Sequence, residues 1–423
     1  MTSPQIALLL ADIAAIIVLA AGFGALARRL GQPAVIGEVA AGLLLGPTVL
    51  GSWSATLFPG PVRFAVQGLA QIAVVLFMFG LGLESGRGRR NAIPPQSLAI
   101  AAGATVLPLA VGMLLTLGPV RAAPGYHGLP AGFTVFVGVA LAITAFPVLA
   151  RILIDAGLYR VPLGRMALAS AAASDVIGWL LLAVAIALAG DGHGPWQLLW
   201  LAPYLVVLMV ITRVGVPRMY AWAAAYPRRR ILATSLMLSG VLASGAVTEA
   251  AGLNLIFGAF LLGLLSPSPD PVDESQTTAA DSASIAAVVH EHAHRVGGLL
   301  LPLFFVAAGL NVNLRLHAAD IAELLLIVAT ACAGKLIGGY LAARLTRIPA
   351  RSAMALAILL NTRGLTELIA LTAGLQLGII NQRLYSLLVC MALITTLATG
   401  PLLRWILRGS TAAVDLVPAT TAA

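Results

Sequence analysis

The sequence predicts an all-α polytopic membrane protein with about thirteen transmembrane helices. Of its 423 residues, 60% are hydrophobic and only 10% are charged, and the apolar residues fall in long runs. A soluble domain carries roughly 25% charged residues, so this chain has too little charge to cover a water-facing surface. We therefore do not interpret its formal charge of +9 as a sign of nucleic-acid binding.

The predicted spans follow from the length of the apolar runs, since a helix needs about 20 apolar residues to cross the hydrocarbon layer. The run at residues 5–27 has no basic segment before it and no small-residue cleavage site after it, so we expect it to be retained as a span. The run centres lie near residues 17, 42, 73, 107, 141, 178, 205, 240, 259, 305, 331, 363 and 395.

The arginines give an independent check on this span count, because inside loops of membrane proteins are enriched in basic residues. With the N-terminus outside, only Arg63, Arg121, Arg315 and Arg383 fall in outside loops. All the other arginines except Arg363 fall on the inside. We therefore expect a multi-pass protein of the cell (inner) membrane with a cytoplasmic loop at 268–296 and a short cytoplasmic tail at 409–423.

Two halves of the chain resemble each other. The segment 37–44 resembles 258–265, and the segment 76–83 resembles 303–310. Both pairs lie seven spans apart, and an odd offset gives opposite orientations in the membrane. This pattern indicates an inverted-topology repeat, with an ion site near mid-membrane where the repeats meet. Chance similarity among Gly- and Leu-rich helices is the alternative, and two pairs in order at one offset argue against it.

The same offset joins two spans that carry helix-breaking residues in their middle. Span 5 contains Thr144 and Pro147, and span 12 contains Asn361, Thr362 and Gly364. Proline removes a backbone donor and clashes with the preceding turn. Unpaired backbone groups at membrane depth are tolerated only where they line a cavity or bind an ion. A simple proline kink would explain span 5 alone, but the matching break in span 12 favours a pair of discontinuous helices.

Asp175 is the strongest candidate for an ion-binding residue. It follows Ser174 within a span and has apolar sequence on both sides. An ionisable residue near the bilayer centre costs on the order of 2.5–3.5 kcal/mol, so its presence calls for a function. One buried carboxyl group can take either a proton or a cation, which is the requirement of exchange. Ser174 and Thr144 can add oxygen ligands for the cation. The alternative is a structural carboxylate that links two helices.

Lys335 is the only lysine of the chain. All the other residues of the lysine and arginine total are arginines. A lone lysine in mid-span indicates that an amine able to lose its proton is wanted there, because arginine does not titrate. We expect Lys335 to pair with a carboxylate or to neutralise the facing ends of the broken helices. A salt bridge that only holds the fold is the alternative.

The other intramembrane charges have weaker assignments. Arg363 and Glu367 are four residues apart at the span-12 break, so they can form an intrahelical pair or compensate half-helix dipoles. We favour charge compensation with a structural role for both. Glu38 can line an ion access path, and Asp12 is expected at a helix or dimer contact.

Enzyme chemistry has no support in the sequence. The chain shows no nucleophile–base pair, and we expect no cofactor and no resident metal. The three histidines His290, His292 and His294 surround Glu291 in the predicted inside loop, and an irregular polar loop explains them better than a metal site does. Cys332 and Cys390 lie in apolar runs and are expected to be buried thiols, not a disulfide.

At several motifs the sequence resembles the plant CHX-type cation/proton exchangers and, more widely, the second family of monovalent cation:proton antiporters. The motifs run through residues 5–408, and together they are specific. They are Ile143-Thr-Ala-Phe-Pro-Val-Leu-Ala-Arg-Ile-Leu153, Asn361-Thr-Arg-Gly-Leu-Thr-Glu-Leu368, Met391-Ala-Leu-Ile-Thr-Thr396, Leu301-Pro-Leu-Phe-Phe-Val306 and the stretch Pro33–Gly51.

The resemblance implies one exchanger domain at 1–408 in which Na⁺ or K⁺ exchanges for H⁺. It implies two crossed discontinuous helices in a core of about 62–190 and 297–408. Dimerisation and gating helices would then occupy about 5–50 and 197–267. The implied partners are the cation, the proton, the lipid bilayer and a second copy of the chain. Asp175 is the implied carrier, and Lys335 matches a basic residue that faces it.

The sequence also departs from these relatives. Electrogenic members carry two adjacent acids where this chain has Ser174 and Asp175, which favours electroneutral one-for-one exchange. The sequence does not choose between Na⁺ and K⁺. Two other functions fit the same pattern: a potassium efflux channel-like protein without obligatory proton coupling, and an exporter of a small organic cation.

Overall fold

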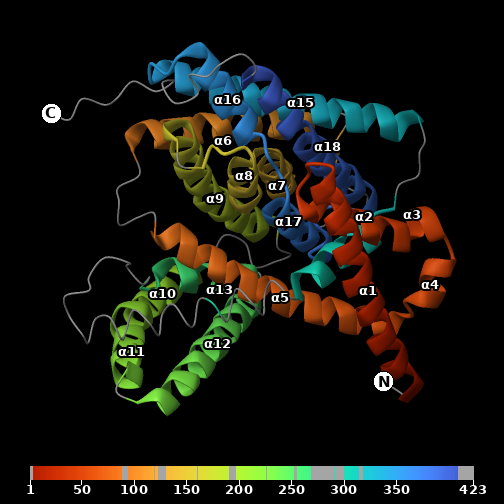
Figure 1. The fold of residues 1–423 in the computed structure, drawn as a ribbon, viewed down its shortest axis with the longest axis vertical. Helices are drawn as coiled ribbons and strands as arrows, with labels where there is room; N and C mark the ends of the chain where they lie inside the picture. The colour runs from red at the N-terminus through yellow and green to blue at the C-terminus, as the bar shows by residue number, and fades with distance from the viewer. Residues whose placement is uncertain are drawn as a thin grey trace. The chain divides into compact units, whose positions relative to one another are not determined.

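The protein is described here by a computed structural model. It describes residues 3–87, 94–118, 120–121, 130–159, 161–189, 197–224, 226–251, 255–267, 291, 300–313 and 318–407. Within these ranges the chain forms helices joined by turns and short connections, and no strand occurs (Figure 1). The all-α class predicted from the sequence is therefore confirmed.

The described helices have the length and composition expected of membrane spans. Eight are long and apolar enough to cross a bilayer, and five further apolar helices are shorter. The eight are Ser3–Arg29, Gly60–Leu83, Pro95–Leu115, Pro162–Ala189, Pro203–Ala223, Arg229–Ala250, Asp320–Leu345 and Gln382–Leu407. The five are Ala34–Leu50, Pro130–Ala142, Leu255–Leu265, Leu300–Leu310 and Ala350–Leu360. Each predicted span centre falls in one of these segments, except that residue 363 lies in the interruption after the last of them.

The chain divides into two compact units. The first unit comprises Pro61–Ala92 and Gly192–Phe304, and the second comprises Thr2–Gly60, Ile93–Asp191 and Phe305–Ala423. The described helices of the first unit are α5 (Gly60–Arg87), α10 (Gln197–Val210), α11 (Val216–Ala224), α12 (Pro227–Ala250) and α13 (Leu255–Leu265), with the π-helical turn η2 (Ile211–Gly215) between α10 and α11.

In the first unit α10, η2 and α11 form one continuous helical rod, and α12 returns beside α11 as a hairpin (Figure 1). Arg229, at the start of α12, lies over the rings of Trp222 and Tyr226, 4.9 and 4.3 Å from their centroids. These cation–π contacts hold the hairpin turn together. Proline begins α12 without penalty, because the first helical N–H has no partner within the helix.

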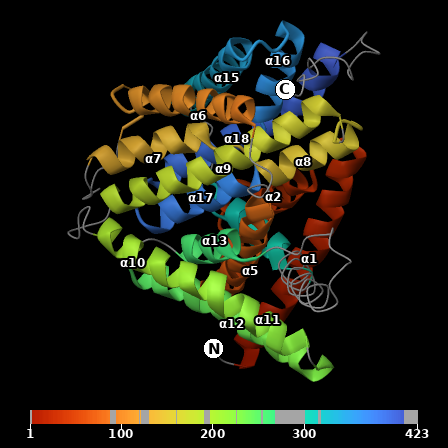
Figure 2. The same ribbon diagram turned by 90° about the vertical axis from the view of Figure 1, so that its left-hand side faces the viewer.

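The second unit contains the remaining labelled helices, and the division between the units falls within the helix Leu300–Leu310. They are α1 (Ser3–Arg29), α2 (Ala34–Leu45), α3 (Pro47–Leu50), α4 (Trp53–Leu57), α6 (Pro95–Leu115), α7 (Pro130–Ala142), α8 (Phe146–Asp155), α9 (Pro162–Ala189), α15 (Ala318–Leu345), α16 (Ala350–Leu360), α17 (Leu365–Gln376) and α18 (Gln382–Leu407). Figure 2 shows α7, α9, α17 and α18 packed one over another in this unit.

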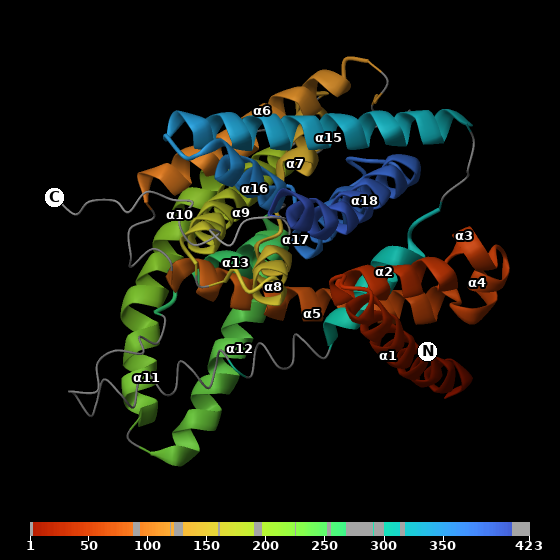
Figure 3. The same ribbon diagram turned by 45° about the horizontal axis from the view of Figure 1, so that its top comes forward.

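The helices α6 and α15 lie side by side in the second unit (Figure 3). Small residues let their backbones approach closely: a Cβ on Gly334 would lie 2.8 Å from the Pro108 Cα, and Gly103 and Gly338 each face the other's carbonyl. Helices in membranes associate largely through such close van der Waals contact. This pair positions Lys335, which lies one residue beyond Gly334.

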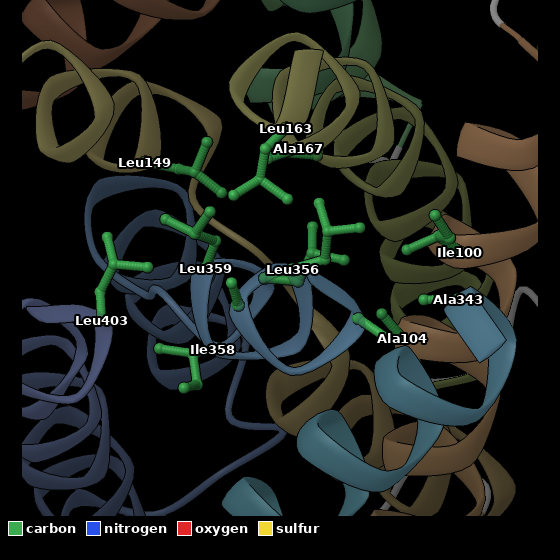
Figure 4. Close-up of a cluster of buried hydrophobic side chains, with 14 of the residues drawn as sticks. Ile100, Ala104, Leu149, Leu163, Ala167, Ala343, Leu356, Ile358, Leu359 and Leu403 are labelled. Atoms are coloured by element: carbon green, nitrogen blue, oxygen red, sulfur yellow. The ribbon is translucent and has the colours of Figure 1, made fainter. Parts of the chain in front are cut away.

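A cluster of buried hydrophobic side chains holds the helix fragments of the second unit together. Leu149 from α8, Leu163 from α9, and Leu356 and Leu359 from α16 meet there (Figure 4). Both α8 and α16 are short, at 10 and 11 residues, so neither can be stable alone. Their fixed positions follow from this shared packing.

Glycine contacts support the predicted repeat. In the second unit a Cβ on Gly42 of α2 would lie 2.9 Å from the Gly309 Cα, and in the first unit a Cβ on Gly263 of α13 would lie 3.1 Å from the Gly82 Cα. The sequence matches Gly42 with Gly263 and Gly82 with Gly309. The two contacts therefore join the same pair of matched repeat positions, each within its own unit, so the sequence similarity has a structural counterpart.

Candidate ion site

Two helix interruptions meet in the second unit. The first comprises residues 143–145 between α7 and α8, and the second comprises residues 361–364 between α16 and α17. The backbone N–H of Ala145 donates to the Thr362 carbonyl at 3.0 Å, and the Thr144 hydroxyl donates to the Leu360 carbonyl at 3.2 Å. The two breaks therefore satisfy part of each other's unpaired backbone, as non-helical chain at membrane depth requires.

Pro147 and Gly364 lie at different positions relative to the two helix breaks. The chain leaves the helix at Ile143, and Pro147 lies in the first turn of α8, where its missing N–H costs no hydrogen bond. Gly364 has φ +155°, a conformation that favours glycine, and a Cβ there would lie 2.7 Å from a Val148 methyl carbon. Gly364 thus permits the close crossing of the second break over α8.

Lys335 lies at the crossing. Its side chain is fully buried on α15, and its ammonium donates a hydrogen bond to the Thr144 hydroxyl. It also interacts electrostatically with Asp175, Glu367 and Arg363. Lys335 therefore lies among the charged residues that the sequence singled out, Asp175, Arg363 and Glu367. Its hydrogen-bond partner is Thr144 of the first break.

Asp175 lies on α9 with 2% of its surface exposed, and Ser174 beside it is equally buried. The Phe146 backbone N–H at the start of α8 makes a hydrogen-bonding contact with the carboxyl group, and Lys335 lies within electrostatic range of it. Yet among the described residues no side chain hydrogen-bonds to either carboxyl oxygen, and the Ser174 hydroxyl has no partner. Buried polar groups are nearly always paired, so these oxygens have hydrogen-bonding capacity that a water molecule or an ion can use.

The second break contributes further buried oxygens of this kind. Asn361 and Thr362 are almost fully buried, and the Asn361 Oδ1 and Thr362 hydroxyl find no partner within the described chain. The Asn361 side-chain amide donates to the Cys332 sulfur at 3.5 Å. Cys332 was not singled out from the sequence as a site residue, although it precedes Lys335 by three residues on the same face of a predicted helix.

Arg363 closes the end of α7. Its guanidinium donates to the carbonyls of Ala140 and Leu141 at 2.7 and 2.6 Å, and to Glu367 at 3.0 Å. The last carbonyls of a helix have no partner within it and form the negative end of its dipole. A fully buried arginine therefore compensates the half-helix end at the first break, and Glu367 balances part of its charge.

Two threonines that sequence reasoning missed hold this arrangement. The Thr396 hydroxyl on α18 donates to the Arg363 carbonyl at 2.8 Å and accepts from the Arg363 N–H at 3.2 Å. The Thr366 hydroxyl on α17 reaches the Thr144 carbonyl at 3.4 Å. Threonine is common in apolar spans, and no sequence pattern connects Thr396 with a residue 33 positions away.

Other predicted residues lie apart from this cluster. Glu38 on α2 faces Gly24 of α1 and interacts electrostatically with Arg28. Asp12 is buried on α1. The three histidines and the segments 268–290, 292–299 and 408–423 lie outside the described residues, and Glu291 is exposed. Among the described residues no group of His, Cys, Asp and Glu suits a metal ion.

The span helices and the two crossed helix breaks are those of a polytopic membrane protein, and comparison with known proteins identifies its family. Residues 14–409 match the family described as sodium/hydrogen exchanger, transmembrane. The chain therefore belongs to the sodium/hydrogen exchanger family.

Individual relatives cover most of the chain. It is 34% identical over 418 residues to the Na(+)/H(+) antiporter NhaS4 of Synechocystis sp., covering 95% of this chain and 98% of that protein. It is 36% identical to Cation/H(+) antiporter 20 of Arabidopsis thaliana over 93% of this chain, and it spans about half (48%) the length of that relative.

A solved structure supports the fold. The sodium proton antiporter MjNhaP1 from Methanocaldococcus jannaschii superimposes with a TM-score of 0.66 at 14% identity. The match covers 96% of this chain and 98% of that one. It shows that the chain has the same fold as that protein.

Proposed function

We propose that this protein is a secondary antiporter that exchanges a monovalent cation, Na⁺ or K⁺, for H⁺ at Asp175. The observation that carries the proposal is the state of that carboxyl group. It is buried, no side chain of the described residues hydrogen-bonds to either of its oxygens, and a lysine lies within electrostatic range. The names of the relatives, which include a Na(+)/H(+) antiporter and a Cation/H(+) antiporter, support the same class of reaction.

In the proposed cycle Asp175 holds either one proton or one cation. A protonated carboxyl group is neutral and tolerates burial, whereas the carboxylate needs a positive partner. A cation at the carboxylate would supply that charge and would bring the unpaired Ser174 hydroxyl into use as an oxygen ligand. Because a single acid carries both ions, the exchange is one for one and moves no net charge.

Lys335 has the role of a competing internal cation. Its ammonium occupies the Thr144 hydroxyl, which is an oxygen that an incoming cation would also use. Cation binding near Asp175 then requires Lys335 to release Thr144. The amine and the cation therefore exclude each other, which prevents the carboxylate from holding a cation while the lysine keeps its present position.

Arg363 and Glu367 serve as fixed charge compensation in this proposal. They are bonded to each other, and Arg363 is also bonded to the end of α7, so that the breaks keep their shape while Asp175 changes its partner. Because the two residues are already paired, we assign neither of them a share in the transported charge.

The remaining features of the proposal concern the assembly. We place the protein in the cell (inner) membrane as a homodimer, with the N-terminus outside and the C-terminus cytoplasmic. The helices of the core, about 62–190 and 297–408, carry the site, and those at about 5–50 and 197–267 form the dimerisation and gating part. Glu38 lies on the access path. Control of internal pH is the physiological role that such exchange supports.

The test is proton movement in everted membrane vesicles that contain the protein. A pH-sensitive dye reports whether Na⁺ or K⁺ salt collapses a preformed proton gradient. Asp175→Asn keeps the size of the side chain but cannot hold a proton or a cation charge. Asp12→Asn is the matched control, because Asp12 is also a buried acid in a span helix and lies apart from the breaks.

We expect native protein and Asp12→Asn to collapse the gradient and Asp175→Asn to leave it intact, at equal amounts of protein. The more effective salt identifies the cation. Cation flux that persists without proton movement would contradict antiport and favour the channel-like alternative. Proton movement only on addition of an organic cation would favour the exporter.

A further inference from the structure

The release of Lys335 from Thr144 leaves a buried ammonium group that needs another acceptor. The Lys335 side chain is fully buried, and its ammonium donates to the Thr144 hydroxyl. An ammonium group has three donors and no acceptor, and a buried charge is costly unless it is hydrogen-bonded. When a cation takes the Thr144 oxygen, as the proposed exchange requires, the lysine must therefore lose its proton or move to a second acceptor.

Asn361 offers such an acceptor at the start of the second break. Its side chain is almost fully buried, and its Oδ1 has no hydrogen-bond partner in the described part of the chain. Its amide nitrogen donates to the Cys332 sulfur at 3.5 Å. The donor end of the amide is therefore occupied, and the end with free capacity is the oxygen, which is the end that an ammonium group needs.

Asn361 adjoins both partners of the Lys335–Thr144 contact. Cys332, which contacts the Asn361 amide, is three residues from Lys335 on α15. Residues at this spacing lie on one face of a helix, with Cβ atoms about 5–6 Å apart. On the other side, the Thr144 hydroxyl donates at 3.2 Å to the carbonyl of Leu360, the residue before Asn361. Both acceptors therefore lie within the reach of one long lysine side chain.

The end of α16 also favours a positive charge at this place. Asn361 is the residue at which α16 ends, and the last carbonyls of a helix form the negative end of its dipole. At the end of α7, the Arg363 guanidinium compensates this charge. At the end of α16, the Leu360 carbonyl accepts from the neutral Thr144 hydroxyl. An ammonium group beside Asn361 would supply to α16 what Arg363 supplies to α7.

We propose that Asn361 is the positioning residue for Lys335 in the cation-bound state: the ammonium leaves the Thr144 hydroxyl and donates to the Asn361 Oδ1. This inference rests on the proposed exchange at Asp175. The lysine keeps its proton throughout, so its charge does not enter the count of transported ions. Asn361 raises the affinity for the cation, because it stabilises the arrangement in which Thr144 is free.

The test observes Lys335 directly, because the only lysine of the chain gives a single side-chain signal. The full chain is made with lysine isotopically labelled at Nζ, placed in lipid nanodiscs and followed by NMR, since the chemical shift distinguishes an ammonium group from a neutral amine. Sodium or potassium chloride replaces choline chloride at constant ionic strength and alkaline pH.

Three variants separate the acceptor from its surroundings. Asn361→Leu removes the acceptor at nearly the same size. Asn361→Asp keeps the oxygen and adds a negative charge. Thr105→Val is the matched control, because Thr105 is also buried with an unpaired oxygen among the described residues and lies on α6, which packs on α15 outside both breaks.

We expect saturating Na⁺ or K⁺ to move the native signal to a second ammonium position. Asn361→Leu raises the half-maximal cation concentration for this shift about tenfold, which corresponds to about 1.4 kcal/mol of binding free energy. Thr105→Val follows the native protein. Asn361→Asp gives the second position before any cation is added, a result that damage to the fold would not produce.

Three outcomes would overturn the role of Asn361 while leaving exchange at Asp175 intact. They are a neutral-amine signal in the cation-bound protein, an Asn361→Leu titration equal to the native one, and equal effects of Asn361→Leu and Thr105→Val. A native signal that responds to neither salt would instead contradict cation binding at Asp175, and the role of Asn361 with it.

Discussion

The two helix breaks of the second unit share a topology but differ in charge. The first break, at residues 143–145, contains no ionisable residue, and its Thr144 is bonded to a lysine from α15. The second break, at residues 361–364, contains its own Arg363, with Glu367 one turn later. The guanidinium of the second break closes the helix end at the first.

This difference shows that the polar groups of each break are not all satisfied within that break. The end of α7 depends on Arg363 from the other repeat, and Thr144 depends on Lys335 from a third helix. The fixed charge and the exchangeable charge are therefore separated: Arg363 has hydrogen bonds to three groups, whereas Lys335 has one to a neutral hydroxyl. Substitutions of the fixed charge, Arg363, should affect folding. Substitutions around the exchangeable charge, Lys335, should affect transport.

The largest effect on stability is expected from Arg363→Gln. It leaves Glu367 as an unpaired buried charge and the α7 carbonyls without their donor, at a cost of about 3–5 kcal/mol in unfolding free energy. Denaturant unfolding in detergent measures this cost. Arg363→Gln combined with Glu367→Gln should recover part of it.

Arg383→Gln is the matched control for that prediction. Arg383 pairs with Asp320 and Glu323, both at 2.6 Å, but its side chain is 50% exposed. Exposed pairs contribute about 0–1 kcal/mol. Equal losses for Arg363→Gln and Arg383→Gln would contradict the claim that the second break holds the first.

Gly364→Ala is expected to have the next largest effect. The positive φ and the nearby Val148 methyl make a Cβ unfavourable, and strain of this kind costs about 1–3 kcal/mol. Gly240→Ala is the control, because a Cβ there meets nothing within 4 Å. Thermal unfolding compares the two variants, and an unchanged Gly364→Ala protein would mean that the crossing tolerates a side chain.

Thr144→Val tests the contact of the exchangeable charge, Lys335, with the first break. It keeps the shape of the side chain and removes the hydroxyl that Lys335 holds, with an expected effect of about 1 kcal/mol on the transition state of transport. Initial rates in proteoliposomes should fall several-fold, and the unfolding free energy should fall by about 1–3 kcal/mol, because the Leu360 carbonyl and the Lys335 ammonium lose a buried partner. Thr144→Ser restores the hydroxyl and should restore the rate; failure of this rescue would remove Thr144 from the transport step.

The smallest effect is expected from Cys332→Ala. Its sulfur accepts one long hydrogen bond from Asn361, and sulfur is a weak acceptor. The loss of stability should not exceed about 0.5 kcal/mol in denaturant unfolding, at the lower end for a single hydrogen bond. A larger loss, with the transport rate reduced as well, would assign Cys332 a role in the shape of the second break.

The sequence predicted much of this arrangement, because membrane burial makes each charge and each helix breaker informative. The span centres, the two interruptions and the buried positions of Asp175 and Lys335 follow from composition and local pattern. The partners do not. The bond from Lys335 to Thr144, the contact of Arg363 with Ala140 and Leu141, and the role of Thr396 depend on helices that meet across long stretches of chain. Local pattern does not encode such contacts.

The central claim is that one proton and one cation compete for Asp175. The most direct measurement is the cation concentration for half-maximal transport by purified protein in proteoliposomes, at a series of pH values. Where the proton occupies the site, the account predicts that this concentration rises about tenfold for each unit of pH lost, with an unchanged maximal rate, since one proton is worth about 1.4 kcal/mol per pH unit. A half-maximal concentration that is independent of pH, with only the maximal rate changing, would contradict the claim.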